Sequence, residues 1–177
     1  MVPPRVVLRN GKMADTICAR DLMRADFLRI GIDQSLGQAM AALREAGGDS
    51  GLPSALMVVD DAGLYRGMLT ARLLIRLLVG GDDGQRAQEA VDDMSLLRAA
   101  RDRLSTRIGD SLVPELPVLS PDDRLLTMIR RGAAMRLDFL PVLREGVPVG
   151  FAPVTAIFQA AAGMALAPAA EGIRFDR

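Results

Sequence analysis

The stretch ALMVVDDAGLYRGMLTARLL at residues 55–74 carries the pattern that decides the fold. An apolar run from Leu56 to Val59 ends at the turn signal DDAG, and a second run from Leu64 to Leu69 follows. Two short apolar runs joined by a glycine-containing turn predict a β-hairpin. The segment ARLLIRLLV comes next, and its leucines recur at helical spacing. We therefore expect a hairpin followed by a helix with one buried face.

The same order of signals returns in DFLPVLREGVPVGFAPVTAI at residues 138–157. A strand is expected from Phe139 to Leu143, a turn at REG, and a second strand from Val147 to about Ala152. The helix TAIFQAAAGMAL follows. Upstream, DLMRADFLRIGIDQSL (21–36) parallels DSLVPELPVLSPDDRL (110–125) in the same way. The chain therefore contains one structural unit twice.

Each copy also carries a helical pattern before its hairpin. The apolar residues repeat at i, i+3, i+4 and i+7, which is typical of an amphipathic helix. They are Leu36, Ala39, Met40 and Leu43 in the first copy, and Leu125, Met128, Ile129 and Gly132 in the second. We expect acidic or serine caps for both helices, from Asp33 and Ser35, and from Ser120 and Asp122. Each copy is thus predicted as β-α-β-β-α, an α/β (α+β) fold.

The repeat divides the chain into five parts. We expect an N-terminal tail at 1–14, a first repeat at 15–80, a linker at 81–105, a second repeat at 106–165 and a C-terminal tail at 166–177. The linker begins with a glycine-rich break and continues as a helix from Gln85 onward. One apolar face of that helix is marked by Ala87, Ala90, Val91 and Met94.

Composition argues against several classes of partner. The 22 basic and 22 acidic residues balance, and aromatic residues make up 3%, so no nucleic-acid partner is expected. Val147 to Ala170 carries no charge, but its prolines and glycines favour a strand followed by a helix over a membrane span. The N-terminus does not resemble a signal peptide. A single cysteine, Cys18, fits a reducing compartment, so we expect a cytoplasmic protein.

The chemistry available for catalysis is sparse. The chain has no histidine, which excludes Ser-His-Asp and Cys-His triads, and Lys12 is its single lysine. Adjacent acidic pairs such as Asp60-Asp61 fall where a turn, a linker, a helix face or a helix cap explains them. No catalytic residue and no metal site is therefore expected, and the chain is not predicted to be an enzyme.

Four motifs carry a resemblance to a known family. They are ARDLM (19–23), MVVDDAGLYRGMLTARLL (57–74), FLPVLREGVPVG (139–150) and VTAIF (154–158). Each copy resembles the CBS domain, and the tandem resembles a Bateman module over roughly residues 15–165. This resemblance implies that the copies pack about a pseudo-two-fold axis with ligand sites in the cleft between them. It also implies that modules associate as homodimers through their helices.

The family's ligand motif is Gly, two apolar residues, Thr or Ser, two further residues, then an Asp that binds a ribose diol. An ionised carboxylate can accept hydrogen bonds from both hydroxyls of such a diol. The first copy reads Gly67–Leu73, which keeps Thr70 but has Leu73 in place of the acid. The second copy reads Gly150–Ala156, with Pro153 in place of the hydroxyl residue and Ala156 in place of the acid.

Other ligand residues follow from the resemblance. Arg72 lies where the family often has a side chain that faces phosphate, and Thr155 lies at the corresponding position of the second copy. The base pocket would be apolar, and its candidate residues are Phe27, Leu28, Leu116, Pro117, Met57 and Pro141. The alternative for that apolar set is ordinary core packing.

Two functions stay open at this point. The first is a regulatory ligand-sensing module that needs no cofactor and binds AMP, ADP, ATP or S-adenosylmethionine. It would act as a homodimer or on a separate protein partner. The second is a degenerate CBS pair that binds no nucleotide and serves as a dimerisation or protein-interaction scaffold, which the loss of both ribose acids favours.

Overall fold

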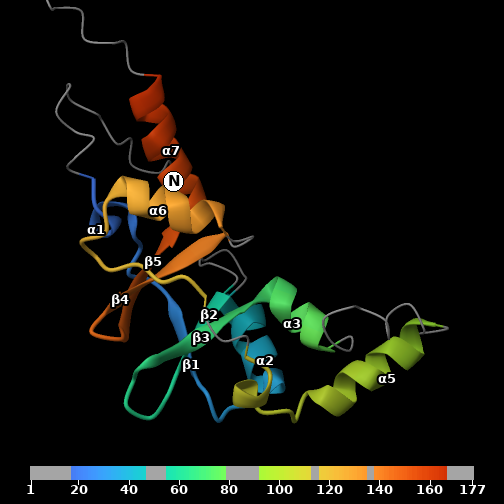
Figure 1. Cartoon of the computed structure of the whole chain (residues 1–177). Coiled ribbons are helices and arrows are strands. Elements are labelled where there is room, and N and C mark those ends of the chain that lie inside the picture. Colours follow the sequence, from blue (N-terminus) through green and yellow to red (C-terminus); the bar gives the residue numbers. More distant parts are fainter. Residues whose placement is uncertain (1–16, 47–54, 79–91, 113–115, 135–137, 167–177) are drawn as a thin grey trace, which may run out of the picture. The chain divides into compact units, whose positions relative to one another are not determined.

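The computed structural model, shown in Figure 1, describes residues 17–46, 55–78, 92–112, 116–134 and 138–166. The described residues form both helices and short strands, which confirms the predicted α+β class. In the expected linker helix, Ala87, Ala90 and Val91 lie outside the described residues, whereas Met94 lies in helix α5 (Asp93–Arg103).

The described residues form two compact units that interleave the two sequence copies. Unit 1 contains the described residues up to 24, together with 117–142 and 151–166. Unit 2 contains the described residues of 25–116, together with 143–150. The N-terminal residues of the first copy thus lie in the same unit as most of the second copy, and the sequence repeat alone does not predict this.

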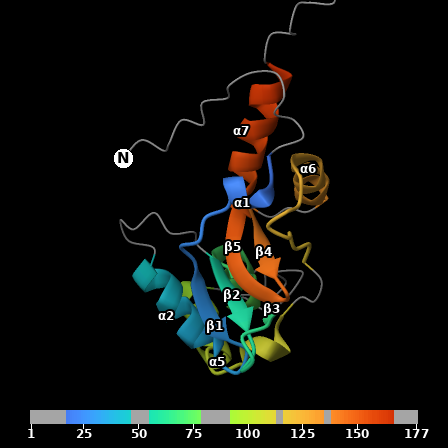
Figure 2. The ribbon, with the colours of Figure 1, turned by 90° about the vertical axis from the view of Figure 1, so that its left-hand side faces the viewer.

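Unit 2 is built on a three-stranded sheet of order β1-β2-β3 (Figure 2). Strand β1 (Leu28–Gly31) runs parallel to β2 (Ala55–Val59), and β3 (Tyr65–Thr70) returns antiparallel to β2. The predicted hairpin is therefore present, with boundaries one residue from those expected. The parallel neighbour β1 requires a crossover, which α2 (Leu36–Ala46) provides.

The side chains on one face of this sheet pack into the hydrophobic core of unit 2. The core cluster joins strand residues with helix residues and consists of Ile30, Leu36, Ala39, Leu56, Val58, Leu69, Leu74 and Ile108. Ile108 lies in the short 3-10 helix η1 (Ile108–Asp110), and Leu74 lies in α3 (Ala71–Leu78). The predicted apolar face of α2 is correct for Leu36 and Ala39. It is wrong for Met40, which is 43% exposed.

Helix α2 begins with a capping box at the serine that the sequence predicted. The Ser35 hydroxyl oxygen accepts a hydrogen bond from the Gln38 N–H at 3.2 Å, and Gln38 Oε1 accepts from the Ser35 N–H at 2.9 Å. This reciprocal pair satisfies two backbone donors at the helix start. Asp33, the other predicted cap, instead forms an ion pair with Arg107.

Unit 1 joins three helices to the base of the second hairpin. The helices are α1 (Ala19–Leu22), α6 (Leu125–Ala133) and α7 (Val154–Ala165). The backbone of α1 is held by second-copy residues, because the Ala19 N–H donates to the Asp123 carbonyl at 2.9 Å. Arg24 and Phe151 exchange two backbone hydrogen bonds, at 2.9 and 3.0 Å. The start of the first copy thereby becomes part of the unit built from the second.

The second hairpin contributes to both units. Strands β4 (Phe139–Arg144) and β5 (Val147–Pro153) have their base in unit 1, and their tip, 143–150, belongs to unit 2. At that tip the Tyr65 N–H donates to the Gly146 carbonyl at 2.8 Å. Glu145 and Gly146 both have positive φ, 53° and 81°, the conformation that a tight two-residue hairpin turn requires.

The first strand predicted for the second copy is reduced to one bridge among the described residues. Leu119 pairs in parallel with Val142, and its N–H donates to the Pro141 carbonyl at 2.8 Å. Pro117 lies two residues earlier and has no N–H with which to extend a ladder. Among the described residues, the β-α-β-β-α order is complete in the first copy, and in the second copy a single bridge stands for the first strand.

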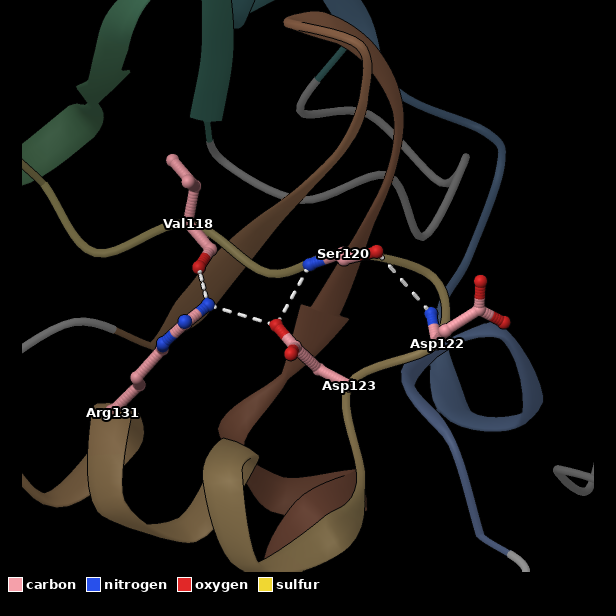
Figure 3. A network of polar contacts seen from close by, with 5 residues as sticks. All are labelled: Val118, Ser120, Asp122, Asp123 and Arg131. Carbon is pink, nitrogen blue, oxygen red and sulfur yellow. Dashed lines mark hydrogen bonds and ion pairs between the residues drawn. The ribbon is translucent and has the colours of Figure 1, made fainter.

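A network of side-chain hydrogen bonds holds the segment from Val118 to Asp123 (Figure 3). Arg131 Nη1 donates to the Val118 carbonyl, and to Asp123 Oδ2 at 2.8 Å. The same Asp123 oxygen accepts the Ser120 N–H at 2.8 Å. Helix α6 has Arg124 at its N-cap and no side-chain cap, so the predicted caps Ser120 and Asp122 are wrong. They lie in the turn that precedes the helix.

The charge-free segment that begins at Val147 forms β5 and then α7, as the sequence predicted. Ile157 and Ala160 face the interior of unit 1, whereas Phe158 is 69% exposed. Within the part of the chain that the structure describes, every helix is too short or too polar to cross a membrane.

Candidate functional site

The β1–β3 sheet has a second face, opposite the one that packs on the core. In β1 and β2 the side chains alternate, so Ile30 and Val58 face the core while Arg29 and Met57 face the other way. On β3, Met68 is paired with Met57 and Thr70 with Ala55. We call the surface formed by Phe27, Arg29, Met57, Met68 and Thr70 the second face. It contains three of the predicted ligand residues.

Thr70 connects this face to helix α3. Its hydroxyl oxygen accepts a hydrogen bond from the Leu73 N–H at 3.1 Å, which makes Thr70 the cap of that helix. The hydroxyl proton is still able to donate to a ligand. Leu73, at the place of the family's acid, packs against the core cluster of unit 2. An apolar side chain there supports packing and offers nothing to a ribose.

Arg72 is exposed in the first turn of α3. The N-terminus of a helix carries a partial positive charge and favours acidic side chains, yet the first turn of α3 contains none. A guanidinium at this position adds to the positive potential instead of balancing it. The arrangement disfavours the isolated helix slightly and attracts an anion.

The predicted apolar residues do not all come together. Phe27 is half-buried on the second face, whereas Leu28 packs against the core cluster on the opposite face. Met57 lies on the second face but is only 3% exposed, so it belongs to the packed interior. For Leu28 and Met57 the placement favours the core-packing alternative.

The remaining predicted residues lie outside the β1–β3 sheet. Leu116, in unit 2, and Pro117, in unit 1, are both half-buried. Pro141 is fully buried in β4, where its carbonyl accepts the Leu119 N–H. Thr155 is exposed in the first turn of α7.

The second copy lacks the capping hydroxyl of the first at the start of its last helix. Pro153 is the N-cap residue of α7 and makes no side-chain cap bond. The half-buried Ala156 stands where the family has its acid. The hydroxyl group that Thr70 offers in the first copy therefore has no counterpart at Pro153.

Arg29 is a residue that the sequence analysis missed. Its guanidinium lies 4.9 Å from the centre of the Phe27 ring, and its Nη2 donates to the Pro148 carbonyl at 3.2 Å. The pattern Leu28-Arg29-Ile30 holds the signal, because strand alternation places the middle side chain opposite the two apolar ones. A charged residue between two apolar residues of a strand therefore indicates a side chain that points away from the core cluster.

The hydroxyl oxygen of Tyr65 is a further polar atom in an unusual environment. Among the described residues, its hydroxyl is the one buried side-chain polar atom without a hydrogen-bond partner. Burial raises the pKa of this phenol above its ordinary value of 10.0, so the group is neutral throughout the physiological range. The described residues contain no group of three or more acidic, cysteine or histidine side chains that could hold a metal ion.

The comparisons with known proteins address the family directly. Residues 19–80 match the family model of the CBS domain. No curated protein sequence matches the chain at a significant level.

Solved structures match over most of the chain. A CBS domain-containing protein of unknown function from Kribbella flavida is 24% identical, with a TM-score of 0.60, and the match covers 82% of this chain and 98% of that one. CBSX2 in complex with AMP is 18% identical, with a TM-score of 0.59 and coverage of 84% and 98%.

The cytosolic domain of the Mg²⁺ channel MgtE in complex with ATP is 22% identical, with a TM-score of 0.58. That match covers 78% of this chain but 46% of the other, so this chain spans about half the length of the MgtE domain. At these identities the structures establish the fold. Residues 19–80 therefore form a CBS domain, in a chain that has the fold of CBS domain-containing proteins.

Proposed function

We propose that this chain is a regulatory module that binds an adenine nucleotide at its first CBS copy. The observation that carries the proposal is the pairing of Thr70 and Arg72 at the start of α3. There, a hydroxyl and a guanidinium lie at the N-terminus of a helix, which carries a partial positive charge. These groups suit a phosphate ester. Two structural relatives are complexes with AMP and with ATP, which supports the same ligand class.

The role proposed is binding, without catalysis and without a required cofactor. The chain has no histidine, and its single cysteine, Cys18, is half-buried at the start of α1. We place the protein in the cytoplasm, where a lone thiol stays reduced. AMP, ADP, ATP and S-adenosylmethionine are the candidate ligands.

We also propose that the module works as a homodimer or on a protein partner. Helices α6 and α7 carry large apolar side chains in solvent: Leu126 is 58% exposed and Phe158 is 69% exposed. Such residues on a small unit are typical of a contact surface. Sedimentation of the protein and of its Phe158→Glu variant would test this, and a wild-type monomer would contradict the homodimer.

The experiment for the ligand is isothermal titration calorimetry with each of the four candidates. We expect the wild type to bind at least one of them, and Arg72→Gln to bind it about tenfold or more weakly, because one charge-assisted hydrogen bond is lost. Thr155→Ala is the matched control in the second copy and is expected to bind like the wild type. No heat from any ligand at millimolar concentration, with a folded protein, would contradict the proposal.

The second candidate function is a scaffold that binds no nucleotide. It is favoured by Leu73 and Ala156, which leave neither copy with a ribose carboxylate. Leu73 packs against the core cluster, so its side chain stabilises unit 2 instead of binding a ribose. A nucleotide that co-purifies with the protein, detected by ultraviolet absorbance and mass spectrometry, would exclude the scaffold.

A further inference from the structure

We infer that Arg29 makes the second face selective for a phosphorylated ligand over an uncharged or cationic adenosyl compound. This inference rests on the proposed function, and it narrows the ligand class of that site. It assigns a specificity role to a residue in the middle of β1, distant in sequence from the start of α3.

The first support is the position of the guanidinium. Arg29 is in register with Met57 on β2, which is in turn in register with Met68 on β3. Its side chain is exposed, although both methionines beside it are buried, at 3% and 2% exposure. Arg29 is therefore the part of this row that a ligand can reach.

The second support is the unused hydrogen-bonding capacity of Arg29. A guanidinium has five N–H donors in a fixed plane. The Pro148 carbonyl takes one of them at 3.2 Å, and the Phe27 ring lies against the group at 4.9 Å. These two contacts hold the plane in place and leave donors for phosphate oxygens. A pre-positioned guanidinium loses less entropy on binding than a free one.

The third support is the charge of the sheet itself. Strands β1, β2 and β3 contain no acidic residue, and their charged side chains are Arg29 and Arg66. Arg66 is already paired with Asp60, at 2.6 Å. Arg72 follows at the start of α3, so the charged side chains of these strands and of the first turn of α3 are all arginines. A sulfonium cation would be repelled there and a phosphate attracted.

Because the ribose-binding acid is absent, the positive charge of Arg29 and Arg72 becomes important for the choice of ligand. With Leu73 in place of the carboxylate, an adenosyl ligand cannot gain the charge-assisted hydrogen bonds that the family's acid would give to its ribose. Discrimination must then come from another part of the ligand. The phosphate is the part that Arg29 and Arg72 can recognise.

The experiment is calorimetry of AMP, adenosine and S-adenosylmethionine at low ionic strength. We expect the wild type to bind AMP at least tenfold more tightly than the other two. Arg29→Gln should weaken AMP about tenfold or more and leave adenosine unchanged, and Arg29→Lys should retain part of the preference. Raising the salt concentration should weaken AMP alone. Arg44→Gln, which removes an exposed charge from α2, is the matched control.

The outcomes separate the two proposals. If AMP and adenosine bind the wild type equally, or if Arg29→Gln weakens both by the same factor, the selectivity of Arg29 is overturned while nucleotide binding stands. If ATP or ADP binds the folded wild type and AMP does not, Arg29→Gln must weaken that nucleotide about tenfold or more, and an unchanged affinity overturns the selectivity of Arg29. If no nucleotide binds, both proposals fail. Thermal melting of each variant confirms that it is folded.

Discussion

The helix that precedes the hairpin, α2 in the first copy and α6 in the second, begins differently in the two copies. In the first copy, β1 lies along β2 over four residue pairs, and Ser35 caps α2 through its side chain. In the second copy, one pair, Leu119 and Val142, stands in for the strand among the described residues, and α6 has no side-chain cap. One apolar pattern thus gives a backbone ladder in one place and a side-chain network in the other.

The prolines explain much of this difference. Pro117 and Pro121 flank the bridge of the second copy, and neither can donate a backbone hydrogen bond. The Val118 carbonyl, which lies between these prolines, accepts its hydrogen bond from the Arg131 side chain. A sequence repeat therefore predicts which helices and strands occur more reliably than it predicts which hydrogen bonds stabilise each of them.

The largest effect is expected from Arg131→Ala, which tests the network of the second copy. We expect it to lower the free energy of unfolding by about 2 kcal/mol, because the Val118 carbonyl and the Asp123 carboxylate both lose a charged donor. Arg130→Ala removes the exposed neighbour on the same helix and should change stability by less than about 0.5 kcal/mol. Urea denaturation measures both, and equal effects would refute the role of the network.

A smaller effect separates the two serines that the sequence predicted as caps. Ser35→Ala should destabilise by about 1 kcal/mol, because it breaks the capping box with Gln38. Ser120→Ala should cost less than about 0.5 kcal/mol, because its hydroxyl oxygen lies 3.5 Å from the Asp122 nitrogen and caps no helix. Thermal melts of the pair would contradict the comparison if Ser120→Ala proved the more damaging.

Tyr65→Phe is expected to stabilise the protein, in contrast to the changes at Arg131 and Ser35. It removes a buried hydroxyl that has no partner and should raise the free energy of unfolding by about 1 kcal/mol. In the matching hairpin of the second copy the corresponding residue is Pro148, which has no polar side chain to bury. Calorimetric melting would show the gain. A loss of stability would mean that the hydroxyl has a bonding partner in solution.

The smallest effect concerns the two hairpin turns and depends on pH. Asp60 accepts the N–H groups of Ala62 and Leu64 at 3.0 and 2.9 Å and pairs with Arg66. The Leu64 N–H first of all, and then Arg66, lower the pKa of Asp60 below its ordinary value of 3.8. Ionised Asp60 therefore favours the folded state above the unfolded pKa, and that contribution is lost as the pH falls through the folded pKa.

Asp60→Asn tests this turn against its counterpart. The wild type should be slightly more stable than Asp60→Asn at pH 6, and the difference should shrink as the pH falls below 3.8 and through the lowered pKa of Asp60. Glu145→Gln makes the same change from acid to amide in the second turn, which depends on the positive φ of Glu145 and Gly146, and is the matched control. A constant difference for Asp60→Asn across this range would exclude the linkage.

Much of the fold follows from local sequence signals. The hairpin boundaries, the helices α3 and α7 and the Ser35 cap are correct, because turns, helical periodicity and capping act between neighbouring residues. The short helix α1 and its contact with Asp123 were missed. That contact joins distant parts of the chain, and nothing local signals it.

The candidate site was predicted only in part, for a similar reason. Thr70 and Arg72 lie at the start of a helix that the sequence locates, so their position could be foreseen. Leu28 was assigned to the pocket on its apolar character, but strand alternation turns it toward the core and exposes Arg29 instead. Which face of the sheet packs on helices depends on tertiary contacts.

The number of nucleotides bound per chain tests most directly the claim that the first copy is the ligand site and the second is not. The measurement is a calorimetric titration of the wild type with AMP, repeated on Arg72→Gln. The account predicts one AMP per chain, with affinity reduced about tenfold or more in the variant. Two equivalent sites per chain, or binding that Arg72→Gln leaves unchanged, would contradict it.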